Sequence, residues 1–161
     1  KILKWDEKFR IKQPDGSEKE IRVEDIRLDA QSFMACGTAI GSCGVIVMDN
    51  TVDIVEALAN LNQFYAHESC GQCTPCREGT LWMSRITRRI CEGWGRPEDV
   101  DLLMSVADNM CGRTICALGE GAAWPTQSNL GKFKDEYCEK IRRQQTMGGQ
   151  ARADNNAYRL I

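Results

Sequence analysis

The segment Glu68–Cys76 reads ESCGQCTPC and places three cysteines at intervals of three residues. Three thiolates at this spacing cannot reach one metal ion from a regular helix or strand. They can surround one cubic cluster where the backbone turns tightly, and Gly71 and Pro75 suit such a turn. The spacing is typical of the first three ligands of bacterial ferredoxins, whereas structural zinc usually pairs two separate C-x₂-C units. The segment therefore predicts an iron–sulfur cluster, with zinc as the alternative.

A fourth thiolate has to come from a more distant part of the chain, and Cys111 and Cys116 compete for this position. Cys111 follows the apolar stripe of an expected helix, where a cysteine is often simply buried. Cys116 lies beyond Gly112 in an irregular segment, and a loop can bring both a thiolate and backbone N–H groups to a cluster. On this ground we favour Cys116. For the other cysteines we expect a buried structural role: Cys36, Cys43, Cys91 and Cys138.

Charged neighbours of the cysteines are candidates for adjusting such a cluster. Four thiolates and a cluster carry net negative charge, so nearby cations and amide donors raise the reduction potential. Arg77 directly follows Cys76, and Arg113 lies three residues before Cys116. His67, the only histidine, could act as a proton-coupled donor near the cluster, with helix capping or packing as the alternative.

The N-terminal part of the chain is expected to be rich in β structure. Polar and apolar residues alternate on both sides of the turn Pro14–Gly16, which predicts a hairpin. A short apolar run at Val45–Met48 predicts one more strand. Residues 1–48 are therefore expected to form a small β-rich segment.

The remaining chain is expected to be mostly helical, which gives an α+β fold class. Residues 49–145 contain four segments in which apolar residues recur at helical spacing, which predicts four helices. The short connections between them predict a mostly antiparallel four-helix bundle. We expect Asn50 to cap the first helix, and Pro97 and Pro125 to open the third and fourth. Residues 146–161 lack an apolar period, which predicts an extended or disordered tail.

Composition excludes several functions. The chain has 161 residues, 42% of them apolar, and a net charge of −2, which disfavours a nucleic-acid partner. No apolar run approaches the roughly 18 residues of a membrane helix, and the first ten residues lack a secretory signal. Nine cysteines without an export signal indicate reduced thiols in a cytoplasmic or equivalent compartment. One histidine and no glycine-rich nucleotide motif favour electron transfer over bond chemistry.

Three segments stand out when taken together: GTAIGSCGVIVMD (Gly37–Asp49), FYAHESCGQCTPCREG (Phe64–Gly79) and GRTICALGEGAAWP (Gly112–Pro125). In this order they closely resemble the NADH-oxidising flavoprotein subunit of respiratory complex I. The resemblance implies that one [4Fe–4S] cluster is bound in a C-terminal helical domain by Cys70, Cys73, Cys76 and Cys116. It also implies that residues 1–48 are the end of a ubiquitin-like middle domain.

The resemblance further implies a place in an electron-transfer chain. The cluster would accept electrons from NADH-reduced FMN and pass them to iron–sulfur subunits of an NADH:quinone oxidoreductase. This complex is expected at the inner membrane, facing the cytoplasm or the mitochondrial matrix. The family's FMN and NADH segments lie N-terminal to anything in this sequence, so we expect the chain alone neither to bind FMN tightly nor to oxidise NADH. As part of the NADH dehydrogenase complex it is expected to belong to an enzyme. The alternatives are the same module in an NAD-linked hydrogenase or formate dehydrogenase, and a zinc-stabilised interaction domain.

Overall fold

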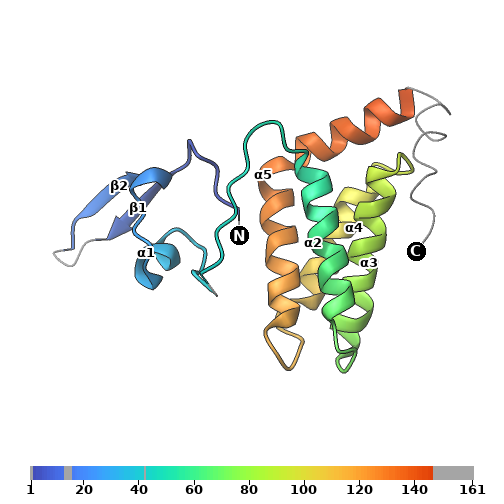
Figure 1. Cartoon of the computed structure of the whole chain (residues 1–161), viewed down its shortest axis with the longest axis horizontal. Helices are drawn as coiled ribbons and strands as arrows, with labels where there is room; N and C mark the ends of the chain where they lie inside the picture. Colours follow the sequence, from blue (N-terminus) through green and yellow to red (C-terminus); the bar gives the residue numbers. More distant parts are fainter. Residues whose placement is uncertain (1, 13–15, 42, 147–161) are drawn as a thin grey trace. The chain divides into compact units, whose positions relative to one another are not determined.

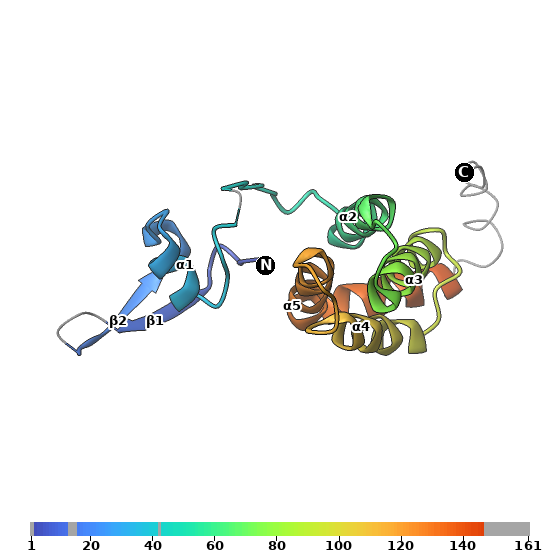
Figure 2. The same ribbon diagram turned by 90° about the horizontal axis from the view of Figure 1, so that it is seen from below.

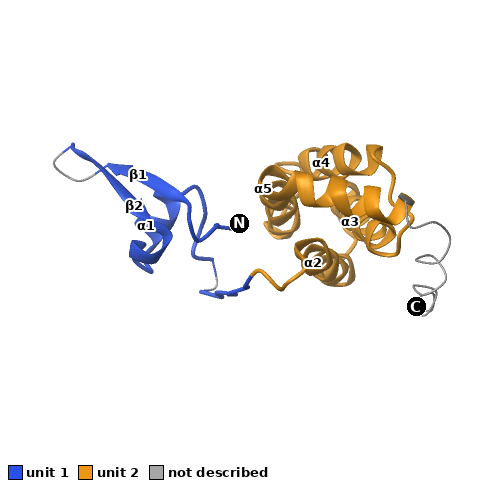
Figure 3. Cartoon of the chain, turned by 90° about the horizontal axis from the view of Figure 1, so that it is seen from above, with its two compact units in different colours: residues 1–49 blue, residues 50–161 orange. Residues whose placement is uncertain are grey.

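The computed structural model describes residues 2–12, 16–41 and 43–146. The chain divides into two compact units, Lys1–Asp49 and Asn50–Ile161, which Figure 3 colours separately. The first contains a small sheet and the second contains only helices among its described residues. The predicted α+β fold class is therefore confirmed. The tail expected at residues 146–161 lies outside the described residues, apart from Thr146 at the end of the last helix.

The first unit is built around a hairpin. Strands β1 (Lys8–Lys12) and β2 (Glu18–Arg22) are antiparallel, with Phe9 opposite Ile21, whose side chain is buried. A 3₁₀ turn, Val23–Asp25, and the short helix α1 (Ala30–Ala35) follow. The predicted hairpin is thus present, although most of its turn lies outside the described residues.

The strand predicted at Val45–Met48 is not formed. These residues have no regular secondary structure, and the side chains of Val45, Ile46 and Val47 are exposed. A strand requires a neighbour that completes its backbone hydrogen bonds. Among the described residues, β1 and β2 pair only with each other, so this segment has no such neighbour.

The second unit is a bundle whose successive helices run in alternating directions (Figure 1). Each helix packs on the next, and the first also packs on the last, which closes the bundle. Its core includes the fully buried side chains of Val55, Met83, Leu103 and Leu130, one from each helix. None of the described helices is both long and apolar enough to cross a membrane. The helices are α2 (Ile54–Glu68), α3 (Thr74–Cys91), α4 (Glu98–Met110) and α5 (Leu118–Thr146).

Helices α2 and α5 both start differently from expectation. Asp53 caps α2 in place of Asn50, because its Oδ1 accepts the N–H groups of Val55 at 2.9 Å and Glu56 at 3.1 Å. Helix α5 begins at Leu118, so Pro125 lies inside it. A proline inside a helix removes one backbone donor and crowds the preceding turn. Ala122 and Ala123 in that turn are fully buried, so packing favours a continuous helix here despite this cost.

Helix α4 begins at Glu98, with Pro97 as its N-cap residue rather than its first helical residue. Pro97 has no side chain that can cap the helix, and the buried Asp99 supplies the acceptor. Its Oδ2 accepts the backbone N–H of Arg96 at 2.9 Å and the Nε–H of Arg89 at 3.0 Å. The start of α4 is therefore tied to α3.

Helix α5 bends at Phe133, whose φ and ψ of −128° and 21° are not helical. Beyond the bend it crosses one end of the bundle (Figure 1), where Tyr137 and Ile141 are buried. Lys140 on this segment forms ion pairs with Asp53 and with Glu56 on α2. The opposite end of the bundle is left to the connecting loops.

Candidate metal centre

The alternating helices place both cysteine-bearing loops at the same end of the bundle. The α2–α3 loop, residues 69–73, and the α4–α5 loop, residues 111–117, both lie at the bottom of Figure 1. Figure 2 views the bundle from this end. Segments that are far apart in the sequence therefore meet where the cysteines are concentrated.

The three-cysteine segment spans the loop and the start of α3. Cys70 is exposed, Cys73 is the N-cap residue of α3 and is half-buried, and Cys76 lies in the first turn of α3 with 7% of its surface exposed. Gly71 has a φ of +77°, a conformation that favours glycine, so it makes the predicted tight turn. Pro75 instead occupies the start of α3, where a missing N–H costs nothing.

Side chains on both sides hold this loop in shape. The Ser69 hydroxyl accepts the N–H of Gly71 at 3.3 Å and lies 3.3 Å from the Sγ of Cys76. From the other side, Nη1 of Arg77 donates to the carbonyl oxygen of Gly71 at 2.7 Å, and Nη2 donates to the Thr74 hydroxyl at 3.4 Å. The conformation of the loop is thus fixed by its own neighbours.

The second loop contains both candidates for the fourth position. Cys111 is half-buried at the end of α4, where its N–H still donates to the carbonyl oxygen of Ala107. Cys116 is exposed, and its carbonyl oxygen accepts a hydrogen bond from the Thr114 hydroxyl at 2.9 Å. The backbone between them turns at Gly112, which has a φ of +73°.

The two loops meet through one hydrogen bond. The backbone N–H of Ile115 donates to the Sγ of Cys73 at 3.4 Å, although the two residues are 42 positions apart. Among the described residues, no three His, Cys, Asp or Glu side chains are close enough together to hold a metal ion. The structure therefore brings the loops into contact at Cys73, without gathering the four sulfur atoms around one point.

The residues at this end of the bundle fit an iron–sulfur cluster by their chemistry. They supply thiols on two adjacent loops and a backbone N–H directed at a cysteine sulfur, and hydrogen bonds to sulfur are a recurrent feature of such sites. Zinc would be bound by the same thiols, so the donor set alone does not separate the two metals.

Two of the three predicted neighbours of the cluster are directed elsewhere. His67 has a side chain that is 85% exposed, and its Nδ1 lies 3.0 Å from Oε1 of Glu68. Nη1 of Arg113 donates to Oδ1 of Asn109 at 2.9 Å. Arg77 is the one that donates to the backbone of the cysteine loop. A role of His67 or Arg113 beside the cluster stays a prediction.

Three residues near the cysteines were missed by reasoning from sequence: Ser69, Thr114 and Glu120. Oε1 of Glu120 accepts the N–H of Gly112 at 2.9 Å, and its Oε2 lies 3.5 Å from the Thr114 hydroxyl. One signal was available, since an acidic residue in the first turn of a helix often accepts backbone N–H groups of the preceding loop.

The other cysteines are scattered over the chain. Cys36 is buried, Cys91 and Cys138 are half-buried, and burial raises the pKa of Cys91 to about 11. Cys43 is exposed, so the expectation of burial is wrong for this residue. Its φ of +64° places it in a turn, where the side chain has no core to enter.

A helical bundle with cysteines on two adjoining loops defines a candidate thiolate metal-binding domain. Residues 56–140 match the family described as the NADH-ubiquinone oxidoreductase-F iron–sulfur binding region, and the chain belongs to this family. The resemblance found in the sequence is confirmed by this match.

The chain is also similar to proteins named as the F subunit of NADH-quinone oxidoreductase. It is 46% identical to the one in Rickettsia typhi and 47% identical to one in Rickettsia bellii, each over 118 residues. These matches cover 73% of this chain and 28% of each relative. The chain thus spans little more than a quarter of the length of these relatives.

Proposed function

We propose that the chain binds one [4Fe–4S] cluster and carries single electrons within an NADH–quinone oxidoreductase. The ligands in this proposal are Cys70, Cys73, Cys76 and Cys116. The observation that carries it is the hydrogen bond from Ile115 N–H to the Sγ of Cys73, because it joins the two cysteine loops and is directed at sulfur. Membership of the iron–sulfur binding family supports it.

Each part of the site has a task in this proposal. The cluster supplies one-electron transfer. Gly71 lets the backbone turn so that Cys70 and Cys73 can face the same side, and Cys76 extends from the positive end of α3, which stabilises a thiolate. The Ile115 N–H lowers the electron density on the Cys73 sulfur. These groups bind and stabilise negative charge and require no acid or base.

The source and destination of the electrons follow from the larger proteins that the chain resembles. In this proposal electrons reach the chain from NADH-reduced FMN and leave to iron–sulfur clusters of neighbouring subunits. FMN and NADH are bound outside these 161 residues. The complex is peripheral to the inner membrane, on its cytoplasmic or matrix side. Residues 49–145 form the cluster-binding domain, and residues 1–48 end a ubiquitin-like domain.

The names of the relatives favour a quinone-reducing complex over a hydrogenase or a formate dehydrogenase as the host. A zinc-stabilised interaction domain is the candidate from another class. It draws on the same thiols, and an N–H donor at a cysteine sulfur also stabilises a zinc thiolate.

Metal content separates the two classes. The chain purified and kept without oxygen is expected to be brown and to contain about four irons and four labile sulfides. Reduction with dithionite should give an EPR signal of a [4Fe–4S] cluster. One zinc per chain with no iron would contradict the proposal, as would a colourless protein after reconstitution with iron and sulfide under reducing conditions.

A further inference from the structure

The two cysteine loops share one construction. Each contains a glycine with a positive φ, Gly71 in the first loop and Gly112 in the second. In each case a charged side chain near the start of the following helix reaches back to the backbone of that glycine: Arg77 on α3 and Glu120 on α5. The two side chains carry opposite charges.

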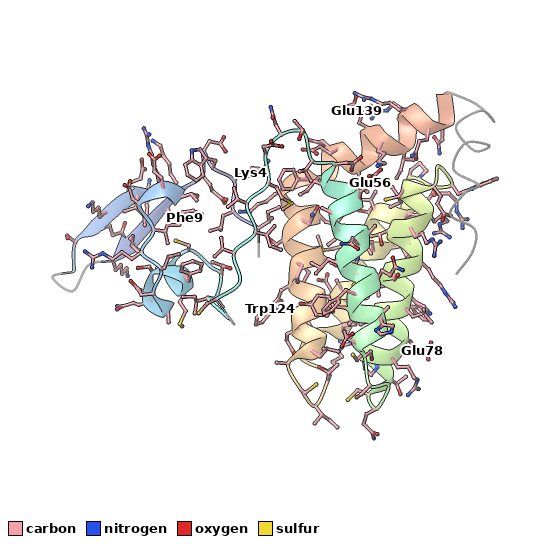
Figure 4. All side chains as sticks on the ribbon, in the orientation of Figure 1. Lys4, Phe9, Glu56, Glu78, Trp124 and Glu139 are labelled. Atoms are coloured by element: carbon pink, nitrogen blue, oxygen red, sulfur yellow. The ribbon has the colours of Figure 1, made fainter. Side chains whose placement is uncertain are left out.

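Arg77 is anchored on the first loop by several bonds. Its Nη1 donates to the Gly71 carbonyl oxygen at 2.7 Å, and its Nε donates to Oε1 of Glu78 at 3.2 Å. The aliphatic part of Arg77 also covers Gly71, because a Cβ atom on this glycine would lie 3.7 Å from Cδ of Arg77. Figure 4 labels Glu78 on the part of α3 nearest the loops. The guanidinium is therefore held beside the three-cysteine segment.

Glu120 is anchored on the second loop in the same way. Its Oε1 accepts the Gly112 N–H at 2.9 Å, and its Oε2 lies 3.5 Å from the Thr114 hydroxyl. That hydroxyl in turn donates to the carbonyl oxygen of Cys116. Glu120 and Thr114 thus hold the backbone of the second loop at Gly112 and at Cys116, the proposed fourth ligand.

We propose that Arg77 and Glu120 are positioning residues that shape the two loops and shift the reduction potential of the cluster in opposite directions. This inference rests on the proposed [4Fe–4S] function. Reduction adds negative charge to a site that is already negative, so a fixed cation favours the reduced state and a fixed carboxylate disfavours it. With both charges present, the reduction potential of the cluster lies below the value with Arg77 alone and above the value with Glu120 alone.

Matched substitutions in the cluster-loaded chain distinguish the effect of the side-chain charge from the effect of the hydrogen bonds that Arg77 and Glu120 make. Arg77→Gln removes the cation, whereas Arg77→Lys keeps it. Glu120→Gln removes the anion but keeps an oxygen that can accept the Gly112 N–H. Arg85→Gln, further along α3, and Glu98→Gln, at the far end of the bundle, are the controls, and both residues are exposed.

The midpoint potential, from EPR-monitored redox titration, is the main measurement. We expect it to fall in Arg77→Gln, to stay near wild type in Arg77→Lys, and to rise in Glu120→Gln. The two controls should shift it much less. Equal shifts in the same direction for Arg77→Gln and Glu120→Gln, or shifts no larger than those of the controls, would overturn the inference.

The loop contacts are tested without the cluster by amide hydrogen exchange. The Gly112 N–H should lose protection in Glu120→Ala and keep it in Glu120→Gln, relative to the metal-free wild type. Unchanged protection in Glu120→Ala would contradict the positioning role. If the wild-type chain bound zinc and no iron, the proposed function would fail by itself, and the exchange result would still decide whether Glu120 holds its loop.

Discussion

Gly79 on α3 lies directly against Met110 on α4, and a Cβ atom on this glycine would be 2.3 Å from Sδ and 2.4 Å from Cγ of the methionine. Met110 is 1% exposed and cannot move into solvent. The two helices therefore approach closely one turn away from the cysteine loops, and the absence of a side chain at residue 79 permits it.

Gly79→Ala is expected to destabilise the chain. An alanine in place of a helical glycine normally gains up to about 1 kcal/mol. Here the added methyl group overlaps Met110, and overpacking of this kind costs about 1–3 kcal/mol. Gly131→Ala in α5 is the control, because nothing lies within 4 Å of the added Cβ. Urea unfolding should show opposite signs for the two variants, and equal stabilisation would mean that the α3–α4 contact is not as described.

Cys116→Ser is expected to damage the cluster much more than Cys111→Ser. A lost thiolate ligand opens the cluster, whereas a lost half-buried thiol costs mainly packing. The measurement is iron content together with the EPR signal of the dithionite-reduced variants. Loss of the signal in Cys111→Ser, with a near-normal signal in Cys116→Ser, would reverse the assignment of the fourth ligand.

Gly119→Ala should lower cluster occupancy although residue 119 is no ligand. Its Cβ atom would lie 2.3 Å from the hydroxyl oxygen of Thr114, the group that holds the Cys116 carbonyl. Gly121→Ala on the same helix is the matched control, since its Cβ would lie 3.5 Å from the Tyr65 hydroxyl, an ordinary contact. Iron per chain after anaerobic reconstitution should fall only in Gly119→Ala. Equal occupancy in the two variants would argue against a role for Thr114.

The ion pair between Lys140 and Asp53 is expected to stabilise the chain over a defined pH range. Burial alone raises the pKa of Asp53, but hydrogen bonds from Lys140 and from the N–H groups of Glu56 and Val55 outweigh it, and the pKa is lowered. Burial lowers the pKa of Lys140, but its hydrogen bonds to the carboxylates of Asp53 and Glu56 outweigh this effect, and the pKa is raised. The stability from Asp53 is present above its unfolded pKa of about 3.9, and that from Lys140 below about 10.4.

Lys140→Met tests this expectation. Because Asp53 is 41% exposed, we expect a loss of only about 1 kcal/mol at pH 7. The difference from wild type should shrink as the pH falls through the lowered pKa of Asp53, and again as it rises through the raised pKa of Lys140. Urea unfolding at pH 3, 7 and 11 provides the comparison. A difference that is as large at pH 3 as at pH 7 would show that Lys140 acts through packing alone.

Cys91 is expected to resist alkylation at neutral pH. Burial raises the pKa of this thiol to about 11, so only about one molecule in a thousand carries the reactive thiolate at pH 8. A short iodoacetamide pulse followed by peptide mass spectrometry should modify the exposed Cys43 and spare Cys91. Modification of Cys91 should increase about tenfold per pH unit up to pH 11. The urea-unfolded chain, in which both cysteines should react, is the control.

Much of the bundle could be predicted from the sequence because its helices carry regular apolar stripes. Leu58, Met83, Leu103 and Leu130 lie at helical spacing within their segments and are buried. The helix boundaries were harder to predict from the sequence, since Asn50 and Asp53 are both good N-cap residues. In the structure Asp53 accepts the N–H groups of Val55 and Glu56, and Lys140, 87 residues away, donates to its other oxygen.

The cysteine pattern indicated which two loops carry the candidate site but not how those loops are held. The Arg77 and Glu120 contacts with glycine backbone depend on local turns that no spacing rule specifies. The strand expected at Val45–Met48 failed for a different reason. Its composition suits a strand, but a strand also needs a neighbouring backbone, which composition does not reveal.

The contact between Cys73 and Ile115 also has a consequence for the unfolded chain. Metal ligands drawn from both loops would close a ring of roughly 40 residues, much as a disulfide does. Chain-entropy arguments value such a closure at about 4 kcal/mol, because the unfolded ensemble loses most of its freedom to separate the two segments. Helices α3 and α4 lie inside this ring, whereas α2 precedes it and α5 follows it in the sequence. Iron loading would then stabilise the folded bundle by restricting the unfolded chain, and without iron the bundle would depend on side-chain packing and on ion pairs such as those of Arg89 with Asp99 and Lys140 with Asp53.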